Sequence, residues 1–430
     1  MLRVSIQTRE VGTVSIGALR LESGRVLPEV HLAYERVGPQ DGPVVLVCHA
    51  LTGNHIAVGT DENPGWWAGL IGSGKPIDTD RYQVVTFNVL GGCDGSTGPT
   101  SIDPETGRPY GPEFPFVTVR DMVRAEYLAL RRLGIDRLHA VIGGSLGGMQ
   151  ALEWGVMYPE YMDLLFPIAV TPWLSDYAIA FNAIGRLAIL SDPAWNGGYY
   201  DPAHPPKAGM IIARMAGMIT YRSAEQFNNR FNRAERDGWG NRHDEVSFQV
   251  ESYLIHHGEK LARRFDANSY LYLLKAMDTH DLGRGRGGIE EAIKRIRARV
   301  VAISYRGDLL YPPQEIAAFV RRLQANGVEA SFYEVDTLYG HDGFLTEFGK
   351  WGPIVREQLE GVSPSLGSGA PSSVNSWKEL NRIEHPWRWA FVPRSYNCPA
   401  IAEPSPVRFA IAGVDRQNPA EARDPSRRQV

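Results

Sequence analysis

Short runs of apolar, mostly β-branched residues recur in the first and last parts of the chain. Four of them have the pattern of buried strands: residues 43–50, 82–89, 138–145 and 299–305. Each run is apolar at nearly every position instead of at alternate positions, as expected for a strand covered on both faces. The pattern therefore predicts a buried, mainly parallel sheet.

Amphipathic helices are expected between these strands. In residues 118–135 the apolar side chains recur near helical spacing, and Gly134 offers a C-terminal stop. A later unit repeats the order, because the strand at 299–305 is followed by a helix, a strand at 331–336 and a second helix. This alternation predicts an α/β fold in which helices cover both faces of the sheet.

The alternation stops between about residues 175 and 295, where long helical stretches take over. We expect residues 175–295 to form a helical lid inserted into a core made of residues 1–174 and 296–361. GRGRGG at 283–288 does not follow a strand, so it is predicted to be a flexible loop and not a phosphate site. Residues 362–430 are rich in Pro, Ser and Gly and are expected to be a poorly ordered tail.

Composition narrows the range of partners. The 430 residues are 43% hydrophobic and 22% charged with a formal net charge of −4, which suggests neither nucleic acid nor an anionic membrane as a partner. The N-terminus lacks a signal-peptide pattern, no apolar run reaches membrane-spanning length, and the three cysteines are scattered. We therefore expect a cytoplasmic protein. No metal site is predicted, since His256 and His257 are adjacent and cannot share one helix face.

The segment AVIGGSLGGMQALEW at 140–154 contains the spacing GxSxG around Ser145. The pattern alone is common and is compatible with a glycine-rich turn. Here, however, a predicted strand ends at the serine and a predicted helix follows it, the arrangement of a nucleophile elbow. The N-terminus of that helix would also place free N–H groups near the serine hydroxyl. Ser145 is therefore a candidate nucleophile.

A serine nucleophile needs a histidine base and a carboxylate that orients the histidine. Where such an elbow follows a parallel strand, the chain order is serine, acid, histidine. Asp308 directly follows the strand at 299–305, and His341 lies in the loop after the strand at 331–336. The alternatives are that Asp308 caps a helix and that His341 is a polar loop residue.

An oxyanion needs two N–H donors. The backbone amide of Leu146 follows the serine, and the amide of Leu51 lies in the loop after the strand at 43–50. His49 and His55 occupy the same early loop, outside the expected triad order, and a structural or substrate-contact role is predicted for them.

Five segments in this order resemble the homoserine O-acetyltransferases of the α/β-hydrolase superfamily, over about residues 10 to 360. The segments are HALTGNH (49–55), FNVLGGCDGSTGPTSIDPETGRPYG (87–111), IGGSLGGMQALEW (142–154), ARMAGMITYRS (213–223) and GHDGFL (340–345). The resemblance implies an α/β-hydrolase fold, a helical lid that mediates homodimerisation, and no cofactor. The sequence departs from the family pattern at Leu146, where Met is frequent, and at Tyr311, where Phe is frequent.

The resemblance also implies substrates and their ligands. The donor would be acetyl-CoA and the acceptor L-homoserine, giving O-acetyl-L-homoserine for methionine biosynthesis through an acyl-serine intermediate. Arg214 matches the arginine that binds the acceptor carboxylate, Asp342 the residue that holds its ammonium group, and Tyr221 an active-site tyrosine. A guanidinium and a carboxylate suit these two charges.

Other functions remain open at this point. A succinyl-CoA-dependent enzyme or a serine acceptor would keep the same chemistry, and Arg222 either meets a succinyl carboxylate or faces solvent. A serine esterase would need the triad without Arg214 and Asp342. A binding module without catalysis is a third alternative, against which the ordered triad argues.

Overall fold

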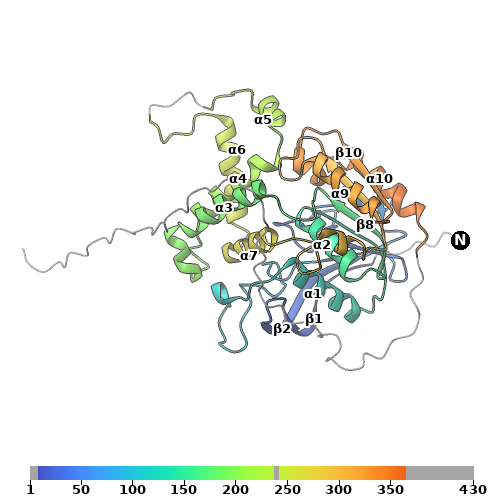
Figure 1. Ribbon diagram of the computed structural model, residues 1–430. Coiled ribbons are helices and arrows are strands. Elements are labelled where there is room, and N and C mark those ends of the chain that lie inside the picture. Colours follow the sequence, from blue (N-terminus) through green and yellow to red (C-terminus); the bar gives the residue numbers. More distant parts are fainter. Residues whose placement is uncertain (1–7, 237–241, 365–430) are drawn as a thin grey trace, which may run out of the picture. The chain divides into compact units, whose positions relative to one another are not determined.

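The protein is described by a computed structural model that covers residues 8–236 and 242–364 (Figure 1). An eight-stranded sheet in this part of the chain has the order β1-β2-β6-β3-β7-β8-β9-β10. From β6 to β10 neighbouring strands are parallel, and β1 and β2 add an antiparallel edge. Its strands are β1 (Arg9–Arg20), β2 (Val26–Val37), β3 (Val44–Cys48), β6 (Gln83–Phe87), β7 (Leu138–Gly144), β8 (Met162–Ile168), β9 (Arg299–Tyr305) and β10 (Ala330–Val335). The predicted parallel sheet is confirmed. A separate short pair is formed by β4 (Ile71–Gly72) and β5 (Ile77–Asp78).

Both faces of the sheet are buried, which explains the continuous apolar runs. In β3, Leu46 and Cys48 point into one core while Val45 and Val47 point into the other. Helices α1 (Val119–Arg132), α2 (Leu146–Met157) and α9 (Pro313–Ala325) cover the first core, and α10 (Phe348–Gly361) covers the second. The predicted helix at 118–135 is confirmed as α1, which Thr118 begins with a capping box to Asp121.

A group of helices occupies the chain between β8 and β9, where a helical insertion is predicted. They are α3 (Asp176–Leu190), α4 (Lys207–Tyr221), α5 (Ala224–Phe231), α6 (Gln249–Ala262) and α7 (Ala267–Asp278), with the 3-10 turn η2 (Pro193–Gly198) after α3. Figure 1 shows α3, α4, α6 and α7 grouped together, apart from α1, α2, α9 and α10 around the sheet. A short helix α8 (Ile289–Ile293) leads back into β9. We call residues 175–295 the lid.

The two ends of the lid run side by side. Trp173 and Asp281 form an antiparallel bridge, and the Leu282 amide donates to the Pro172 carbonyl at 2.8 Å. The lid therefore leaves and re-enters the core at neighbouring points.

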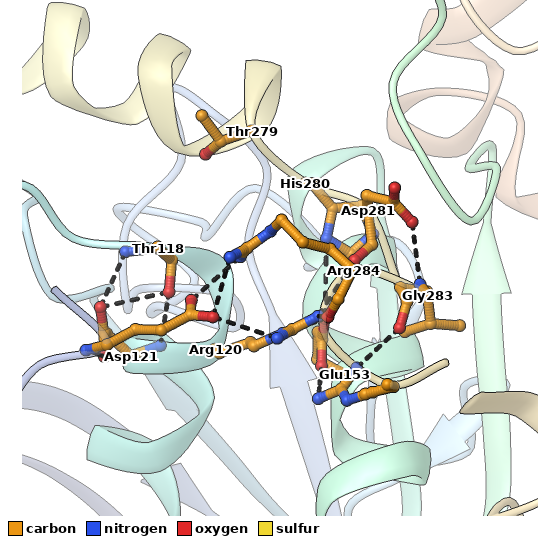
Figure 2. Close-up of polar contacts among 12 residues, drawn as sticks. Thr118, Arg120, Asp121, Glu153, Thr279, His280, Asp281, Gly283 and Arg284 are labelled. Carbon is orange, nitrogen blue, oxygen red and sulfur yellow. Dashed lines mark hydrogen bonds and ion pairs between the residues drawn. The ribbon is translucent and has the colours of Figure 1, made fainter. Parts of the chain in front are cut away.

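The glycine-rich exit segment of the lid is held by buried ion pairs (Figure 2). Arg120 of α1 pairs with Glu22 at 3.0 Å and with Glu153 of α2 at 3.2 Å, and it also donates to the Arg284 carbonyl at 2.7 Å. Arg286 pairs with Glu153 at 2.6 Å. Residues 283–288 form a loop, as predicted, but its arginines pair with carboxylates on distant elements, which argues against the expected flexibility.

The tail predicted at 362–430 lies outside the described residues beyond residue 364. Within the described ranges, no helix is long and apolar enough to cross a membrane.

Candidate active site

Ser145 occupies the turn between β7, which ends at Gly144, and α2, which begins at Leu146. Its φ of 57° and ψ of −121° lie outside the usual regions for a residue with a side chain, as a sharp strand-to-helix turn requires. A Cβ atom at Gly147 would lie 2.1 Å from the Cys48 carbonyl oxygen, and one at Gly143 would lie 2.4 Å from the Gly147 oxygen. The glycines of GxSxG are therefore required by close backbone packing.

Asp308 and His341 are brought together from separate loops. Asp308 follows β9, and His341 lies in the 3-10 turn η3 (Gly340–Leu345) that follows β10. The His341 Nδ1 atom lies 2.8 Å from Asp308 Oδ2, and both side chains are buried. The other carboxylate oxygen accepts hydrogen bonds from the amides of Leu310 and Tyr311 at 2.9 and 3.0 Å. Asp308 is therefore fixed as an acceptor for the Nδ1 proton of His341.

The electrostatics around His341 favour a base that holds its proton well. Burial alone would lower the pKa of His341, but the adjacent Asp308 carboxylate, together with Asp342, raises it above the usual value. The imidazole ring is enclosed by aromatic rings whose centroids lie 5.3 Å away for Tyr311, 5.8 Å for Tyr221 and 5.4 Å for Phe344. Tyr221, expected as an active-site tyrosine, is one of these rings, whereas the contacts of Tyr311 and Phe344 with His341 were not predicted from the sequence.

One cavity collects most of the predicted site residues. It is lined by Leu51, Ser145, Arg214, Tyr221, His341 and Asp342, together with apolar side chains of α3, α4 and α7. Asp308 stands behind His341, and neither His49 nor His55 lines the cavity. Residues from position 51 to position 342 thus meet in one place, partly beneath the lid.

Two backbone amides are available as oxyanion donors. Leu146 is the first residue of α2, so its N–H has no partner within the helix. Leu51 lies in the loop after β3 and lines the cavity. Within the described residues, neither amide donates to a protein acceptor. Both therefore remain available to a ligand.

The charged side chains of the cavity differ in their pairing. The Arg214 guanidinium lies 5.3 Å from the centre of the Tyr221 ring, and no carboxylate in the described ranges is within ion-pair distance of it. Asp342 forms an ion pair of 2.7 Å with Arg222, and both side chains are largely buried. Burial raises the pKa of Asp342, while Arg222 and then Arg214 act in the opposite direction.

The partner of Arg222 was missed at the sequence level. Its position one residue after Tyr221 suggested a donor carboxylate or solvent, but the structure pairs it with Asp342. No group of three or more His, Cys, Asp or Glu side chains suited to a metal ion occurs in the part of the chain that the structure describes.

The parallel sheet, the elbow at Ser145 and the Asp308–His341 pair define a protein of the α/β-hydrolase fold. Residues 43–348 match the family model described as alpha/beta hydrolase fold. Over 350 residues the chain is 50% identical to a homoserine O-acetyltransferase of Symbiobacterium thermophilum, an alignment that covers 79% of this chain and 90% of that protein. The chain belongs to the homoserine O-acetyltransferase family.

Two solved structures place this assignment in context. The structure of homoserine O-acetyltransferase from Bacillus anthracis has a TM-score of 0.78 and 29% identity, covering 84% of this chain and all of that chain. The crystal structure of esterase E22 has a TM-score of 0.76 and 27% identity, with 82% of this chain covered. The same fold thus accompanies both an acetyltransferase and an esterase, so the fold alone does not distinguish the two activities.

Proposed function

We propose that this protein transfers an acetyl group from acetyl-CoA to the hydroxyl of L-homoserine through an acetyl-Ser145 intermediate. Membership of the acetyltransferase family supports the reaction. The single observation that carries the residue roles is the cavity, in which a nucleophile, a base and a pair of charges for an amino acid lie together.

Acylation would begin at Ser145. His341 Nε2 accepts the hydroxyl proton as the serine oxygen attacks the thioester carbonyl, and Asp308 stabilises the imidazolium that forms. The amides of Leu51 and Leu146 donate to the oxyanion. When the carbon–sulfur bond breaks, His341 returns the proton to the CoA thiolate, which leaves an acetyl-enzyme.

Deacylation would use the same groups in reverse. Arg214 binds the carboxylate of homoserine and Asp342 binds its ammonium group, which brings the acceptor hydroxyl toward the acetyl carbon. His341 removes the hydroxyl proton as the new ester forms and then returns it to Ser145. The free charge of Arg214 supports this role, because an unpaired guanidinium within a partly apolar cavity calls for an anionic ligand.

The lid would separate transfer from hydrolysis. Helices α3, α4 and α7 contribute cavity walls, so the acetyl-enzyme is sheltered from bulk water while homoserine is bound. A plain esterase has no need for the oppositely charged Arg214 and Asp342. A succinyl donor is also disfavoured, because Arg222 does not line the cavity, whereas its ion-pair partner Asp342 does. Serine, which is one methylene shorter than homoserine, remains the alternative acceptor.

We further propose that two copies associate through the lid. Apolar side chains on the outside of α3 and α4 are about half exposed, namely Tyr177, Ile184, Leu187, Ile212 and Ile219. A grouping of this kind on adjacent helices is typical of an interface. Light scattering of Leu187→Asp tests it, since a variant that keeps the mass of a dimer would contradict this assignment. A cytoplasmic location remains a prediction from composition.

A donor-by-acceptor matrix tests the reaction. CoA release from acetyl-CoA and succinyl-CoA is followed with homoserine, serine or water, and we expect the acetyl-CoA and homoserine pair to be fastest. Release that does not depend on an amino acid would refute transfer. Ser145→Ala should abolish the reaction without unfolding the protein, and Arg214→Ala should mainly raise the KM for homoserine.

A further inference from the structure

His49 is a buried histidine that touches the oxyanion loop from behind. Its side chain is 1% exposed and lies outside the lining of the cavity. The ring Nδ1 atom lies 2.7 Å from the carbonyl oxygen of Ala50. The other ring nitrogen, Nε2, accepts a hydrogen bond from the Val89 amide at 3.0 Å, and the Asn88 side-chain amide lies 3.2 Å from it.

These partners determine which nitrogen carries the proton. The Val89 amide can only donate, so Nε2 must be the acceptor and is unprotonated. The Ala50 carbonyl can only accept, so Nδ1 must carry the proton. Burial lowers the pKa of His49 to about 4, which keeps the ring neutral near pH 7. His49 is thus a neutral ring held in the Nδ1–H tautomer.

The carbonyl that receives this proton belongs to the same peptide group as the Leu51 amide. In a trans peptide the N–H and the C=O are coplanar and point in opposite directions, so fixing the carbonyl fixes the N–H. The Ala50 carbonyl also accepts a hydrogen bond from the Gly53 amide at 2.9 Å. Two donors to this carbonyl therefore fix the plane of the peptide whose N–H belongs to the cavity-lining Leu51.

We propose that His49 is a positioning residue for catalysis, which orients the Ala50–Leu51 peptide so that the Leu51 N–H points at the oxyanion. This inference rests on the proposed function only in that Ser145 must be the acylated nucleophile. His49 touches neither donor nor acceptor. Its effect should therefore fall on the rate of reaction at Ser145 and not on the binding of homoserine.

The test compares His49→Phe, which keeps an aromatic ring without a donor, with His49→Asn, whose side-chain amide can donate near the Nδ1 position. Removing one oxyanion donor costs about 10²- to 10³-fold in rate, and a misdirected donor should cost about 10-fold or more. We expect His49→Phe to slow acylation by p-nitrophenyl acetate and turnover with acetyl-CoA to this extent. The KM for homoserine should change less than about twofold, and His49→Asn should recover much of the rate.

His139→Phe is the matched control for a purely structural effect. His139 is also buried, and its Nε2 atom lies 3.0 Å from the Leu359 carbonyl, but it stands six residues before Ser145 on the same strand. We expect this variant to lose stability and to acylate at the wild-type rate. Equal slowing in both phenylalanine variants would overturn the proposal, as would acylation of His49→Phe at the wild-type rate.

A measurement on the wild-type protein tests the proposal even if a variant fails to fold. Nitrogen-15 NMR of histidine-labelled protein, assigned with His49→Asn, should show an unprotonated Nε2 and a protonated Nδ1 for His49 at pH 7. An Nε2–H tautomer would refute the argument. Failure of the proposed function is recognised separately: wild-type protein that is not acylated at Ser145 by p-nitrophenyl acetate would refute the acyl-serine step, and CoA release that does not depend on homoserine would refute transfer.

Discussion

Replacing Glu153 with glutamine would remove one negative charge from the buried ion pairs at the base of the lid. Glu153 is 1% exposed and faces the guanidinium groups of Arg120 at 3.2 Å and Arg286 at 2.6 Å. These two arginines lower the pKa of Glu153 against the effect of burial. His280, whose pKa burial lowers to about 4, is neutral near pH 7 and adds no positive charge there.

The expected loss in the free energy of unfolding depends on which ion pairs each arginine retains. Arg120 retains Glu22 at 3.0 Å, whereas no other carboxylate pairs with Arg286 in the described ranges. Breaking a buried ion pair costs about 3–5 kcal/mol when one charge is left behind. Because one of the two arginines stays paired, we expect the free energy of unfolding to fall by about 3 kcal/mol in Glu153→Gln.

Urea unfolding at pH 7, followed by tryptophan fluorescence, measures this loss. The control is Glu291→Gln, which breaks a 2.6 Å pair with Lys294 in which both side chains are about half exposed, and should cost at most about 1 kcal/mol. The sign with pH is also fixed. Because the pKa of Glu153 is lower in the folded protein than its value of 4.5 in the unfolded chain, its charge stabilises the fold above pH 4.5, and this stabilisation is lost as the pH falls further. The difference in free energy of unfolding between the wild type and Glu153→Gln should therefore shrink below pH 4.5. A loss no larger than that of Glu291→Gln would refute the reasoning.

Three further changes test the site and the core. Arg222→Met should raise the KM for homoserine at least about tenfold, and more at low pH, because without the Arg222 cation the pKa of Asp342 rises further and its carboxylate is protonated more easily. Steady-state kinetics measures this KM, and the rate of acylation should stay unchanged. An unaltered KM would contradict the prediction. Asp308→Asn should lower kcat by about 10³- to 10⁴-fold. The acid limb of its pH–rate profile should also move to lower pH, since the Asp308 carboxylate raises the pKa of His341. Burial raises the pKa of Glu126 to about 8, so the folded protein keeps this proton between pH 4.5 and 8 while the unfolded chain loses it, and the free energy of unfolding of the wild type should fall by about 1.4 kcal/mol per pH unit over that range. Denaturation of Glu126→Gln at several pH values should lack this fall. Parallel stability–pH profiles for the two proteins would contradict the prediction.

The parallel part of the sheet could be predicted because burial on both faces leaves a direct trace in the sequence. β3, β6, β7 and β9 are short and buried, and each was expected within about two residues of its observed bounds, as was the half-buried edge strand β10. The edge strand β1 was missed because it is largely exposed and its apolar residues are interrupted by polar residues and glycines. β8 was also missed, since MDLLFPI includes an aspartate and a proline, although its neighbours in the sheet bury it.

The candidate site divides in the same way. Ser145, Asp308 and His341 could be located because strand, turn and chain order constrain them, and the structure brings Asp308 and His341 within hydrogen-bond distance. The partner of Arg222 could not be found, because it depends on how the end of α4 meets η3, 120 residues later. The same is true of the loop at 283–288, whose Arg284 pairs with Glu22, 262 residues earlier.

The adjacent ends of the lid have a consequence for how such a chain can change. Because Trp173 and Asp281 are bridged, the insertion leaves and rejoins the core at one place, and its helices contact the core again through Arg222–Asp342 and through the Arg264 side chain, which donates to the Thr52 carbonyl. Helices can be lengthened, shortened or exchanged beyond that point without altering the spacing of the strands that carry Ser145, Asp308 and His341. The lid carries Arg214, whereas Asp342, Ser145 and His341 belong to the core, so an exchanged lid would change one wall of the cavity and leave the other in place.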